Sequence, residues 1–560
     1  MKVTFKHEIK TTDKISKQEI IDIILKNRQI KNVVEFLSPP HPSKIQITDF
    51  GFKRELKRTL RILEEIKAKN RMIVVYTDYD ADGITGGAIL WETLNLLGFR
   101  VMPYVPHRKL EGYGFSMKGI DAVKKEFDPA LIISVDHGIT AREKVKYAKK
   151  LGIPIIITDH HLKPEKLPDD AEAIFHIPVL SGSGVSYFFS KAVFEYFCSR
   201  KHSNFQLLTS HFICDYLALA AIGTIADLVA LTGPSRSIVK YGLETFGNVK
   251  RYGIKHILAE GGITGKKITP YEVGFIIAPR INAVGRLEHA IDALRLLCTK
   301  NDQRAFELAS KVGQHNRTRQ DLVMTAVKEA KEMVKNLLEL PKIIILQNDN
   351  WHEGIIGLIA SKLTEEFYRP TIILTKSDGF LKGSARSIPA LHITDLLRKH
   401  KKYLIDVGGH KGAAGFTIEV KKFTTFAAIV GKVVNKLLSD KDLERKLEAD
   451  LKIPLSKITM DLAKELESLQ PFGMGNPQPV FLSQAQVVET KTFGKTNNHL
   501  KLYVKNPDDN SYPLEMIAFS GANLIDSLKK GTVTDIAYSI EIDRWRGDER
   551  LRGKIIFPKS

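Results

Sequence analysis

The chain has 560 residues, of which 43% are hydrophobic, so it can bury several cores and, by length alone, form about three or four domains. Its formal net charge at pH 7 is +20. This excess of positive charge indicates a polyanionic partner and favours nucleic acid over an anionic membrane surface, although a generally basic solvated surface would have the same composition.

The cysteines and the first residues indicate the compartment. Cys198, Cys214 and Cys298 are far apart in apolar surroundings and fit neither a disulfide framework nor a zinc motif, so we expect buried thiols in a reducing compartment. Residues 1–10 lack the apolar segment and cleavage site of a secretory signal, and no uninterrupted apolar run of about 18 residues occurs. We expect a cytoplasmic protein without a membrane partner.

The first part of the chain changes from a helical to an alternating pattern. Residues 1–70 are charged and read as helical, with a turn at SPPHPS. From residue 73, apolar runs alternate with amphipathic stretches, which predicts a parallel sheet with helices on both faces and a ligand site at the carboxyl ends of its strands. The predicted strands are residues 73–76 (IVVY), 100–106 (RVMPYVP), 131–136 (LIISVD) and 153–161 (IPIIITDHH).

The second half of the chain indicates a further α/β lobe and a barrel. A long charged helix is expected before a second α/β pattern, which begins with KIIILQ, and the short alternating strands after it predict a small antiparallel barrel. The predicted regions are an N-terminal helical region (1–70), a first α/β domain (71–302), a connecting helix (303–340), a second α/β domain (341–440) and the barrel (441–560).

Carboxylates and histidines follow three of the predicted strands. Asp80 and Asp82 follow the first strand, Asp136 ends the third, and residues 159–161 (DHH) end the fourth. The carboxyl ends of parallel strands share one edge of a sheet, so we expect these side chains to converge there. Asp227 lies in the apolar segment AAIGTIADLVAL and is a further candidate, because burying an unpaired carboxylate is costly.

A cluster of this kind is a predicted metal site. Neighbouring carboxylates repel one another and need divalent cations, and a mixed Asp/His set without thiolates suits Mn²⁺ or Mg²⁺ better than zinc. The candidates suffice for two ions, which together stabilise the attacking and leaving oxygens of a phosphoryl displacement and lower the pKa of a water molecule. Each motif alone could be a solvated turn or a helix cap, but their repetition at successive strand ends favours the metal site.

The ordered motifs resemble those of the DHH phosphoesterase superfamily. The first α/β domain carries DYDADG, SVDHG, TDHH and GTIADLVAL, while the second α/β domain carries WHEGIIG, GSARS and GGHKGAAG, which resemble motifs of the DHH-associated (DHHA1) domain. APRINAVGRL and PFGMGNPQPVF are similar to motifs of its single-strand-specific exonucleases, which end in an OB-fold. The resemblance spans residues 70–560 and implies a two-metal 5′→3′ exonuclease that degrades single-stranded DNA to 5′-mononucleotides in DNA repair and recombination.

The resemblance implies a role for each residue of the acidic motifs. Asp80 and Asp136 would bind one ion, and Asp82, Asp136, His160 and Asp227 would bind the other, so that Asp136 bridges the two. The ions would be Mn²⁺ or Mg²⁺.

Three neighbouring residues would assist these ligands. Asp78 and Asp159 would orient them, and His161 would lie near the scissile phosphate as a stabiliser or an acid. Many relatives carry His where this chain has Tyr76, so the first ion is expected to have fewer protein ligands. The catalytic set is then Asp82, Asp136, His160 and His161.

A second set of residues would hold substrate phosphates by the same resemblance. Arginine binds phosphate oxygens with its planar fork, and glycine lets backbone N–H groups approach them. Arg108 could instead be a surface residue and Arg280 a salt-bridge partner at a helix end. The phosphate or DNA set is Arg108, Arg280, Ser384, Arg386, Gly409 and His410, and Arg544, Trp545 and Arg546 are candidates in the barrel.

Two rival functions stay open at this point. The same chemistry could act on small substrates, as in a DHH-family oligoribonuclease or small-nucleotide phosphoesterase, but such relatives generally have the two α/β lobes alone. A DNA-binding protein that has lost its metals is the second rival, and the complete ligand set argues against it. The expected partner is single-stranded DNA, with a single-strand-binding protein and a helicase as candidates, and we expect a monomer.

Overall fold

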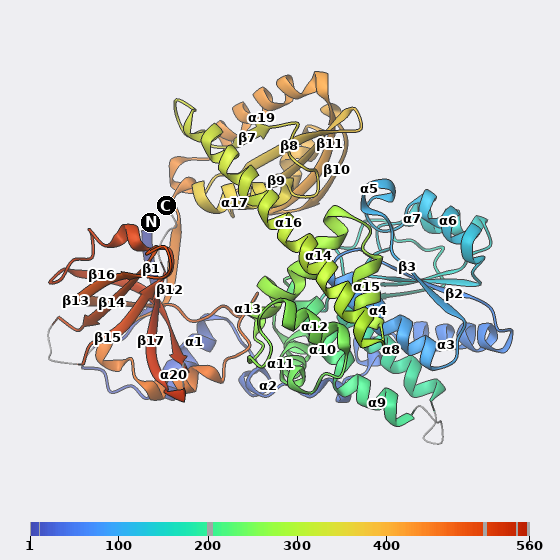
Figure 1. Ribbon diagram of the computed structural model, residues 1–560, viewed down its shortest axis with the longest axis horizontal. Helices are drawn as coiled ribbons and strands as arrows, with labels where there is room; N and C mark the ends of the chain where they lie inside the picture. The colour runs from blue at the N-terminus through green and yellow to red at the C-terminus, as the bar shows by residue number, and fades with distance from the viewer. Residues whose placement is uncertain (1, 11, 199–204, 508–511, 545–546, 557–560) are drawn as a thin grey trace. The chain divides into compact units, whose positions relative to one another are not determined.

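The computed structural model describes residues 2–10, 12–198, 205–507, 512–544 and 547–556 (Figure 1). The chain divides into two compact units. The central unit comprises residues 32–318 and 470–477, and the terminal unit comprises residues 1–31, 319–469 and 478–560. The first 31 residues therefore group with the second half of the chain.

The central unit is built on a five-stranded parallel sheet with the strand order β3-β2-β4-β5-β6, which confirms the predicted parallel sheet. The chain leaves β2 toward β3 on one side and returns to β4 on the other, so the strand order reverses between β2 and β4. Ligands of open parallel sheets bind at such a switch point. The strands are β2 (Ile73–Thr77), β3 (Val101–Tyr104), β4 (Leu131–Val135), β5 (Ile155–Asp159) and β6 (Ala173–His176).

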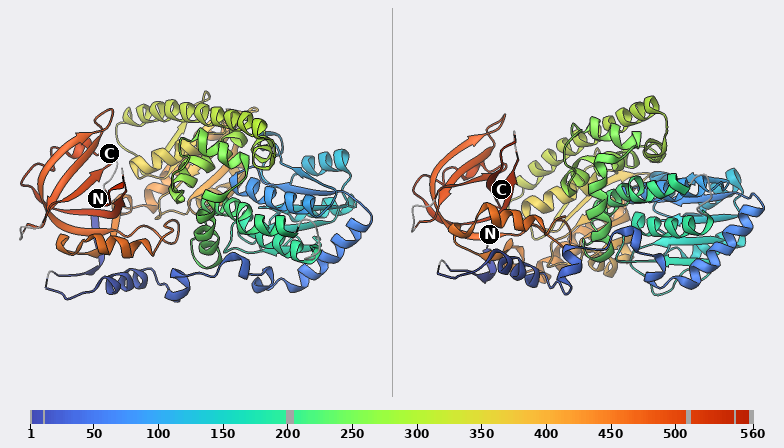
Figure 2. Two further views of the ribbon diagram at one scale, coloured as in Figure 1. Left: turned by 60° about the horizontal axis from the view of Figure 1, so that its bottom comes forward. Right: turned by 90° about the horizontal axis from the view of Figure 1, so that it is seen from below.

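Helices cover both faces of this sheet (Figure 2). Val74 and Tyr76 of β2 pack in a core with α6 and α7, whereas Ile73 and Val75 pack in a larger core with α4, α8 and α10. This division follows from the pleat, which directs successive side chains to opposite faces. The helices are α4 (Ala81–Leu96), α6 (Met117–Phe127), α7 (Arg142–Lys150), α8 (Gly182–Phe197) and α10 (Asp215–Ala226).

One segment of the central unit is apolar enough to cross a membrane by length and composition. It spans Thr209–Ala226, with a mean hydropathy of 1.3, and 67% of it is buried inside the protein. The backbone breaks at Cys214, between α9 (Phe205–Ile213) and α10, and Asp215 interrupts the apolar run. The sequence reading therefore missed this window, whose second part is a core helix of the central unit.

The terminal unit contains a second five-stranded sheet in the order β10-β11-β9-β8-β7, in which only β7 and β8 are parallel. The predicted second α/β domain thus has a mixed sheet. Ala330 and Val334 of α16 (Asp302–Lys335) pack with Ile359 of α17 (Ile356–Phe367), so the predicted long helix ends in this core. The strands are β7 (Ile344–Gln347), β8 (Thr371–Ser377), β9 (Phe380–Arg386), β10 (Leu404–His410) and β11 (Ala413–Glu419).

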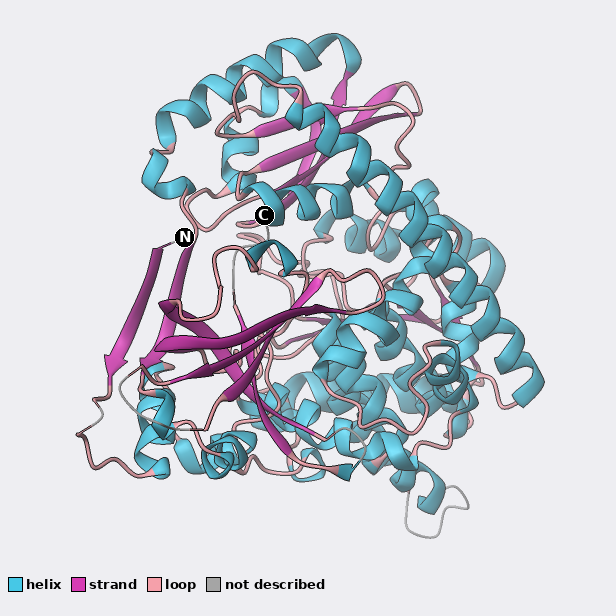
Figure 3. Ribbon diagram, turned by 60° about the vertical axis from the view of Figure 1, so that its left-hand side comes forward, coloured by secondary structure: helices cyan, strands magenta, loops and turns pink. Residues whose placement is uncertain are grey.

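The third sheet forms the predicted barrel (Figure 3). Its order is β1-β12-β13-β14-β15-β17-β16, and a further pairing of β13 with β16 closes the five strands β13 to β17 on themselves. β1 (Lys2–Glu8) pairs in parallel with β12 (Lys446–Lys452), so the segment read as helical begins with a strand whose partner is remote in the sequence. The others are β13 (Phe481–Phe493), β14 (His499–Lys505), β15 (Leu514–Ala518), β16 (Val533–Asp543) and β17 (Arg550–Ile555). The predicted domain limits stay predictions.

A buried ion pair connects α4 to α12 (Tyr252–Glu260) within the central unit. Two guanidinium nitrogens of Arg251 donate to the two carboxylate oxygens of Glu92, at 2.8 and 2.7 Å, and one of them also donates to Leu297 O. The side chains are only 5% and 11% exposed. Because both charges are removed from water, losing either one would leave the other buried without a counter-ion.

We predict that Glu92→Gln destabilises the central unit. The substitution leaves the Arg251 charge buried without its counter-ion, which typically costs about 3–5 kcal/mol of unfolding free energy. Urea unfolding followed by circular dichroism measures the change. Asp128→Asn, which breaks the exposed pair with Lys124, is the matched control and should leave the midpoint unchanged. Equal midpoints for Glu92→Gln and the unmodified protein would contradict the prediction.

Candidate metal centre

The loop after β2 places Asp78, Asp80 and Asp82 at the switch point of the sheet. Asp80 is the N-cap of α4, and its Oδ1 atom accepts hydrogen bonds from Asp82 N and Gly83 N, each 3.0 Å long. These bonds satisfy free amides at the start of the helix. The loop therefore has a fixed shape, in which the aspartates are held by the backbone that carries them.

A second helix supports the same loop from outside. Ala81 N donates a 2.8 Å hydrogen bond to Asn282 Oδ1, and Asn282 lies on α14 (Ala278–Leu287). The sequence reading missed this support. The only feature of the sequence that pointed to Asn282 was its place within the motif APRINAVGRL.

The start of α8 binds the carboxylate of Asp82. Gly182 N donates to Asp82 Oδ2 (2.6 Å) and Ser183 N donates to Asp82 Oδ1 (2.9 Å), so the negative charge lies at the positive end of a helix. Gly182 has no room for a side chain, because a Cβ atom there would lie 2.4 Å from Asp136 Oδ1. The helix end can therefore approach both aspartates.

His160 lies among the carboxylates that follow the strands. Its Nε2 atom is 3.1 Å from Asp136 Oδ1, 3.4 Å from Asp227 Oδ2 and 4.0 Å from Asp82 Oδ2. Asp227 caps the carboxyl end of α10. Within the part of the chain that the structure describes, three sets have ligand atoms within 4.8 Å of one another: Asp136, His160 and His161; Asp82, His160 and Asp227; and Asp78, Asp80 and Asp136.

The electrostatics of this cluster fit bound cations. Among the described residues, Asp78 Oδ1, Asp136 Oδ1 and His160 Nε2 are buried polar atoms without a hydrogen-bond partner. Burial, and then neighbouring carboxylates, raise the pKa of Asp78, Asp80 and Asp136, and they raise the pKa of Asp227 to about 8. The cluster cannot carry its full negative charge unaided, and its oxygen and imidazole donors suit Mn²⁺ or Mg²⁺.

His161 is oriented by Asp159. Its Nδ1 atom lies 2.8 Å from Asp159 Oδ1, and Ile139 N donates to the other carboxylate oxygen at 2.8 Å. Burial lowers the pKa of His161, but the hydrogen bond and charge of Asp159 outweigh it and raise the pKa to about 9. Tyr113 Oη is 3.0 Å from His161 Nε2 and 3.2 Å from Asp136 O. Sequence reasoning missed Tyr113, although it lies in the stretch EGYG that follows Arg108.

Tyr76 is not part of the carboxylate cluster. Its ring packs against those of Tyr104 and Phe115, with centroids 4.8 and 4.9 Å away, and its hydroxyl lies 3.5 Å from Glu111 Oε2. His137, whose Nε2 lies 3.0 Å from Tyr76 O, is fully buried, and burial lowers its pKa to about 4. Both side chains therefore support the loops around the site.

The two predicted phosphate-binding arginines of the central unit differ in their surroundings. The Arg108 guanidinium lies 5.1 Å from the centroid of the Tyr79 ring, in the aspartate loop. Arg280 donates to Ile276 O (2.8 Å) and Glu260 O (3.3 Å), so its guanidinium is engaged by backbone carbonyls. A phosphate-binding role stays a prediction for both.

The remaining phosphate-binding candidates lie together on the second sheet. Ala413 of β11 pairs with Arg386 of β9 on one side and His410 of β10 on the other, so the Arg386 and His410 side chains share one face. Arg386 donates to Ser384 Oγ at 3.3 Å. Gly409 has φ 143° and cannot carry a Cβ atom, which would lie 2.3 Å from Ala413 O.

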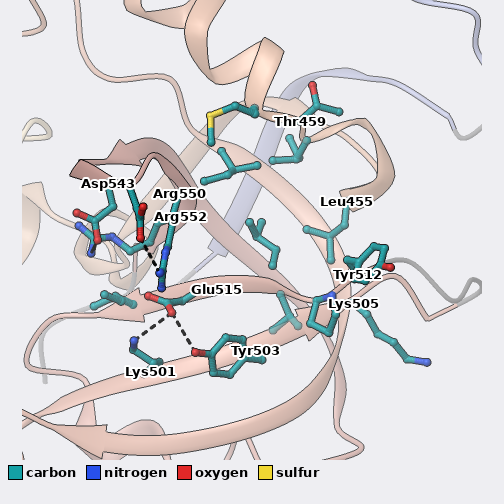
Figure 4. A pocket seen from close by; sticks show the side chains of 18 of the residues that line it. Leu455, Thr459, Lys501, Tyr503, Lys505, Tyr512, Glu515, Asp543, Arg550 and Arg552 are labelled. Carbon is teal, nitrogen blue, oxygen red and sulfur yellow. Dashed lines mark hydrogen bonds and ion pairs between the residues drawn. The ribbon is translucent and has the colours of Figure 1, made fainter. Parts of the chain in front are cut away.

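The barrel has a pocket of 1110 Å³ lined by aliphatic, aromatic, basic and acidic side chains (Figure 4). Several of its charges are paired: Glu515 accepts from Lys501 and Tyr503, each at 3.0 Å, and Arg552 donates to Asp543. Of the barrel residues suggested by sequence, Arg544 pairs with Glu467 and Glu549, whereas Trp545 and Arg546 lie outside the described residues.

Comparison with known families supports the reading of the motifs. Three family profiles match: "DHH family, N-terminal domain" over residues 72–224, "DHHA1 domain" over 340–436 and "RecJ OB domain" over 449–556. The RecJ of Haemophilus influenzae, named single-stranded-DNA-specific exonuclease, is 31% identical over 98% of this chain and 98% of that protein. The chain belongs to the RecJ family. The predicted superfamily and OB domain are thereby confirmed.

Other RecJ proteins are also similar to this chain, in sequence or in structure. The RecJ of Bacillus subtilis is 33% identical over 90% of this chain, and the chain spans 63% of that relative's length. The structure of Thermus thermophilus RecJ in complex with Mn²⁺ has a TM-score of 0.80 at 26% identity, covering 99% of this chain and 79% of that one. The structure of that RecJ with Mg²⁺ has a TM-score of 0.72 at 25% identity, covering 99% and 78%.

We predict that the metal-free protein loses stability as the pH rises from 7 to 9. The pKa values of Asp227 (about 8) and His161 (about 9) are raised by folding, so the folded state keeps protons that the unfolded state releases at lower pH. This contribution is present at low pH and is lost as the pH rises through the folded values. The thermal unfolding midpoint in EDTA should therefore be lower at pH 9, and Mn²⁺ should reduce the difference.

A pair of variants tests the origin of this slope. Asp227→Asn removes one titrating carboxylate, so the unfolding midpoint in EDTA should change less between pH 7 and 9. Asp169→Asn, at an exposed carboxylate of the same unit, should leave the pH dependence of the midpoint unchanged. An unfolding midpoint that does not change between pH 7 and 9 in EDTA would contradict the proposed strain in the cluster.

Proposed function

We propose that this protein is a divalent-metal-dependent 5′→3′ exonuclease that hydrolyses single-stranded DNA to 5′-mononucleotides, in DNA repair and recombination. The observation that carries the proposal is the cluster of carboxylates and histidines at the switch point, in which buried ligand atoms face one another without hydrogen-bond partners. The names of the RecJ relatives support the substrate and the reaction.

The ligand sets suggest how two ions would be held. Asp80 and Asp136 would hold one, and Asp82, His160 and Asp227 would hold the other together with Asp136. Two bound cations would supply positive charge to the attacking and leaving oxygens of a phosphoryl displacement and lower the pKa of a water molecule. Asp78 shares a ligand set with Asp80 and Asp136, which supports a role beside the first ion.

The chain's own groups would position the scissile phosphate. Asp159 fixes the His161 ring and raises its pKa to about 9 in the metal-free protein. A protonated His161 would stabilise a phosphate oxygen or donate its proton to the leaving oxygen. Tyr113 limits the rotation of the same ring. Arg108, which lies over the Tyr79 ring beside the aspartates, would add a second positive charge.

The terminal unit would bind the 5′ end and the rest of the strand. Ser384, Arg386 and His410, with the close backbone approach allowed by Gly409, would hold the 5′-phosphate. The barrel would bind further nucleotides through basic and aromatic side chains. Because basic side chains would neutralise phosphates and release counterions, affinity would fall steeply with salt.

The rival small-substrate function has less support. An oligoribonuclease or nucleotide phosphoesterase of the superfamily needs the two α/β lobes, whereas this chain also matches the RecJ OB domain. A monomeric state and assistance by a single-strand-binding protein and a helicase are further parts of the proposal. A cytoplasmic location is another, supported by the isolated cysteines and by the family resemblance.

We predict that Asp136→Asn abolishes hydrolysis without unfolding the protein. Loss of the bridging carboxylate would remove several kcal/mol of transition-state stabilisation, a rate loss of about 10³-fold or more. Release of nucleotides from a long single strand labelled at either end, with Mn²⁺ or Mg²⁺, measures it, and the 5′ label should be released first. Asp169→Asn is the control. Activity confined to very short oligomers, or unimpaired by Asp136→Asn, would contradict the proposal.

A second prediction concerns the 5′ end. Arg386→Ala should raise the KM for a strand with a 5′-phosphate about 10- to 100-fold, because a charge-assisted contact is lost, and should leave the KM for a 5′-hydroxyl strand nearly unchanged. Arg398→Ala, at an exposed arginine of the same domain, is the control. If the Arg386 variant still distinguished the two ends as the unmodified protein does, Arg386 would not bind the 5′-phosphate.

A further inference from the structure

An exposed aromatic pair lies on the helical stretch that leads to Asn282 and has no role in the chemistry described so far. The rings of Tyr271 and Phe275 are stacked, with centroids 4.8 Å apart and planes inclined by 28°. The two residues are 59% and 69% exposed. Two large neighbouring aromatic rings in water are unfavourable, and such patches usually mark a binding surface.

The local sequence shapes the backbone that carries this pair. Thr269 and Glu272 form a capping box at the start of the helix, and Pro270 occupies its first turn. Pro279 cannot donate to the carbonyl of Phe275 and clashes with a regular turn, and the helix widens into a π turn over Val273–Ile277. Turns of this kind are frequent at functional sites. The backbone that carries the two rings therefore has a defined path, and the rings stack on each other.

The helix that carries the pair also reaches the metal centre. A Cβ atom on Gly274 would lie 4.0 Å from the side chain of Ile225, two residues before Asp227. Asn282 of the same helical stretch binds the aspartate loop through Ala81 N. Seven residues separate Phe275 from Asn282, which is about 10 Å along a helix. A polymer held at the metal centre could therefore reach the two rings within a few nucleotides.

The charges near the pair fit a polyanion. Lys266 and Lys267, a few residues before the rings, are exposed, whereas the carboxylate of Glu272 is turned to its own helix cap at Thr269. Bases stack on aromatic side chains without sequence preference, because every base has a π face. Exposed aromatic rings next to basic side chains are typical of sites that bind single-stranded nucleic acid.

We propose that Tyr271 and Phe275 form a stacking platform for the bases of single-stranded DNA next to the metal centre. The proposal rests on the proposed function and adds a binding site to it. Stacking at this position would hold the strand near the cleavage site without reading its sequence. It would also favour unpaired bases, whose faces are free, over bases stacked within a duplex.

Two probe strands test the platform with the full-length protein. Fluorescein-labelled oligo-dT and an abasic strand of equal length are titrated by anisotropy in EDTA, which prevents cleavage. Tyr271→Ala/Phe275→Ala should weaken oligo-dT binding about 10-fold or more, because each lost base stack costs several-fold in affinity, and should not change binding of the abasic strand. Phe306→Ala, at another exposed aromatic of the central unit, is the matched control and should behave like the unmodified protein.

Further measurements separate stacking from a structural role. Tyr271→Phe keeps the ring and should retain affinity, and the double variant should show a higher KM for long strands with an unchanged kcat. A strand containing 2-aminopurine should be less quenched by the double variant. Affinity for oligo-dT within twofold of the unmodified protein, or equal losses on both strands, would overturn the proposal.

Other outcomes are equally decisive. If the double variant changed the sedimentation of the protein and bound oligo-dT normally, the pair would be a protein interface and the platform would be rejected. If the unmodified protein neither bound nor cleaved single strands, the proposed function itself would fail. An active unmodified protein with an unaffected double variant rejects the platform alone.

Discussion

Repulsion among buried and half-buried carboxylates at the switch point is the constraint on which the central unit depends. Asp80, Asp82 and Asp136 follow adjacent strands, and Asp227 joins them from the end of a core helix. Burial and mutual repulsion raise the pKa of three of them, so the fold favours their protonated forms when no cation is bound. The same strain that weakens the metal-free protein gives it affinity for divalent ions.

The surrounding structure offsets this repulsion at specific atoms. The first amides of α8 bind Asp82, Asn282 fixes the loop that begins α4, and Asp159 raises the pKa of His161. The net positive charge of the chain would act separately, by attracting the polyanionic nucleic acid. The bound cations would act on the phosphates of that nucleic acid. A local excess of negative charge within a basic protein is therefore a requirement of the chemistry.

The sequence predicted features that depend on local pattern. The strands before Asp78, Asp136 and Asp159 were predicted from their apolar runs, and their parallel arrangement placed the acidic ends together. The sequence could not predict contacts between remote segments, such as the pairing of β1 with β12 or the hydrogen bond between Ala81 and Asn282. Periodicity carries no information about such partners, and a tyrosine in a loop gives no sign that it will meet a histidine.

The assignment of two ions bridged by Asp136 is tested most directly by electron paramagnetic resonance during titration with Mn²⁺. The unmodified protein should bind two ions per chain and show the spin coupling of ions that share a ligand. Asp136→Asn should abolish the coupling. A single bound ion, or two ions without coupling, would contradict the assignment.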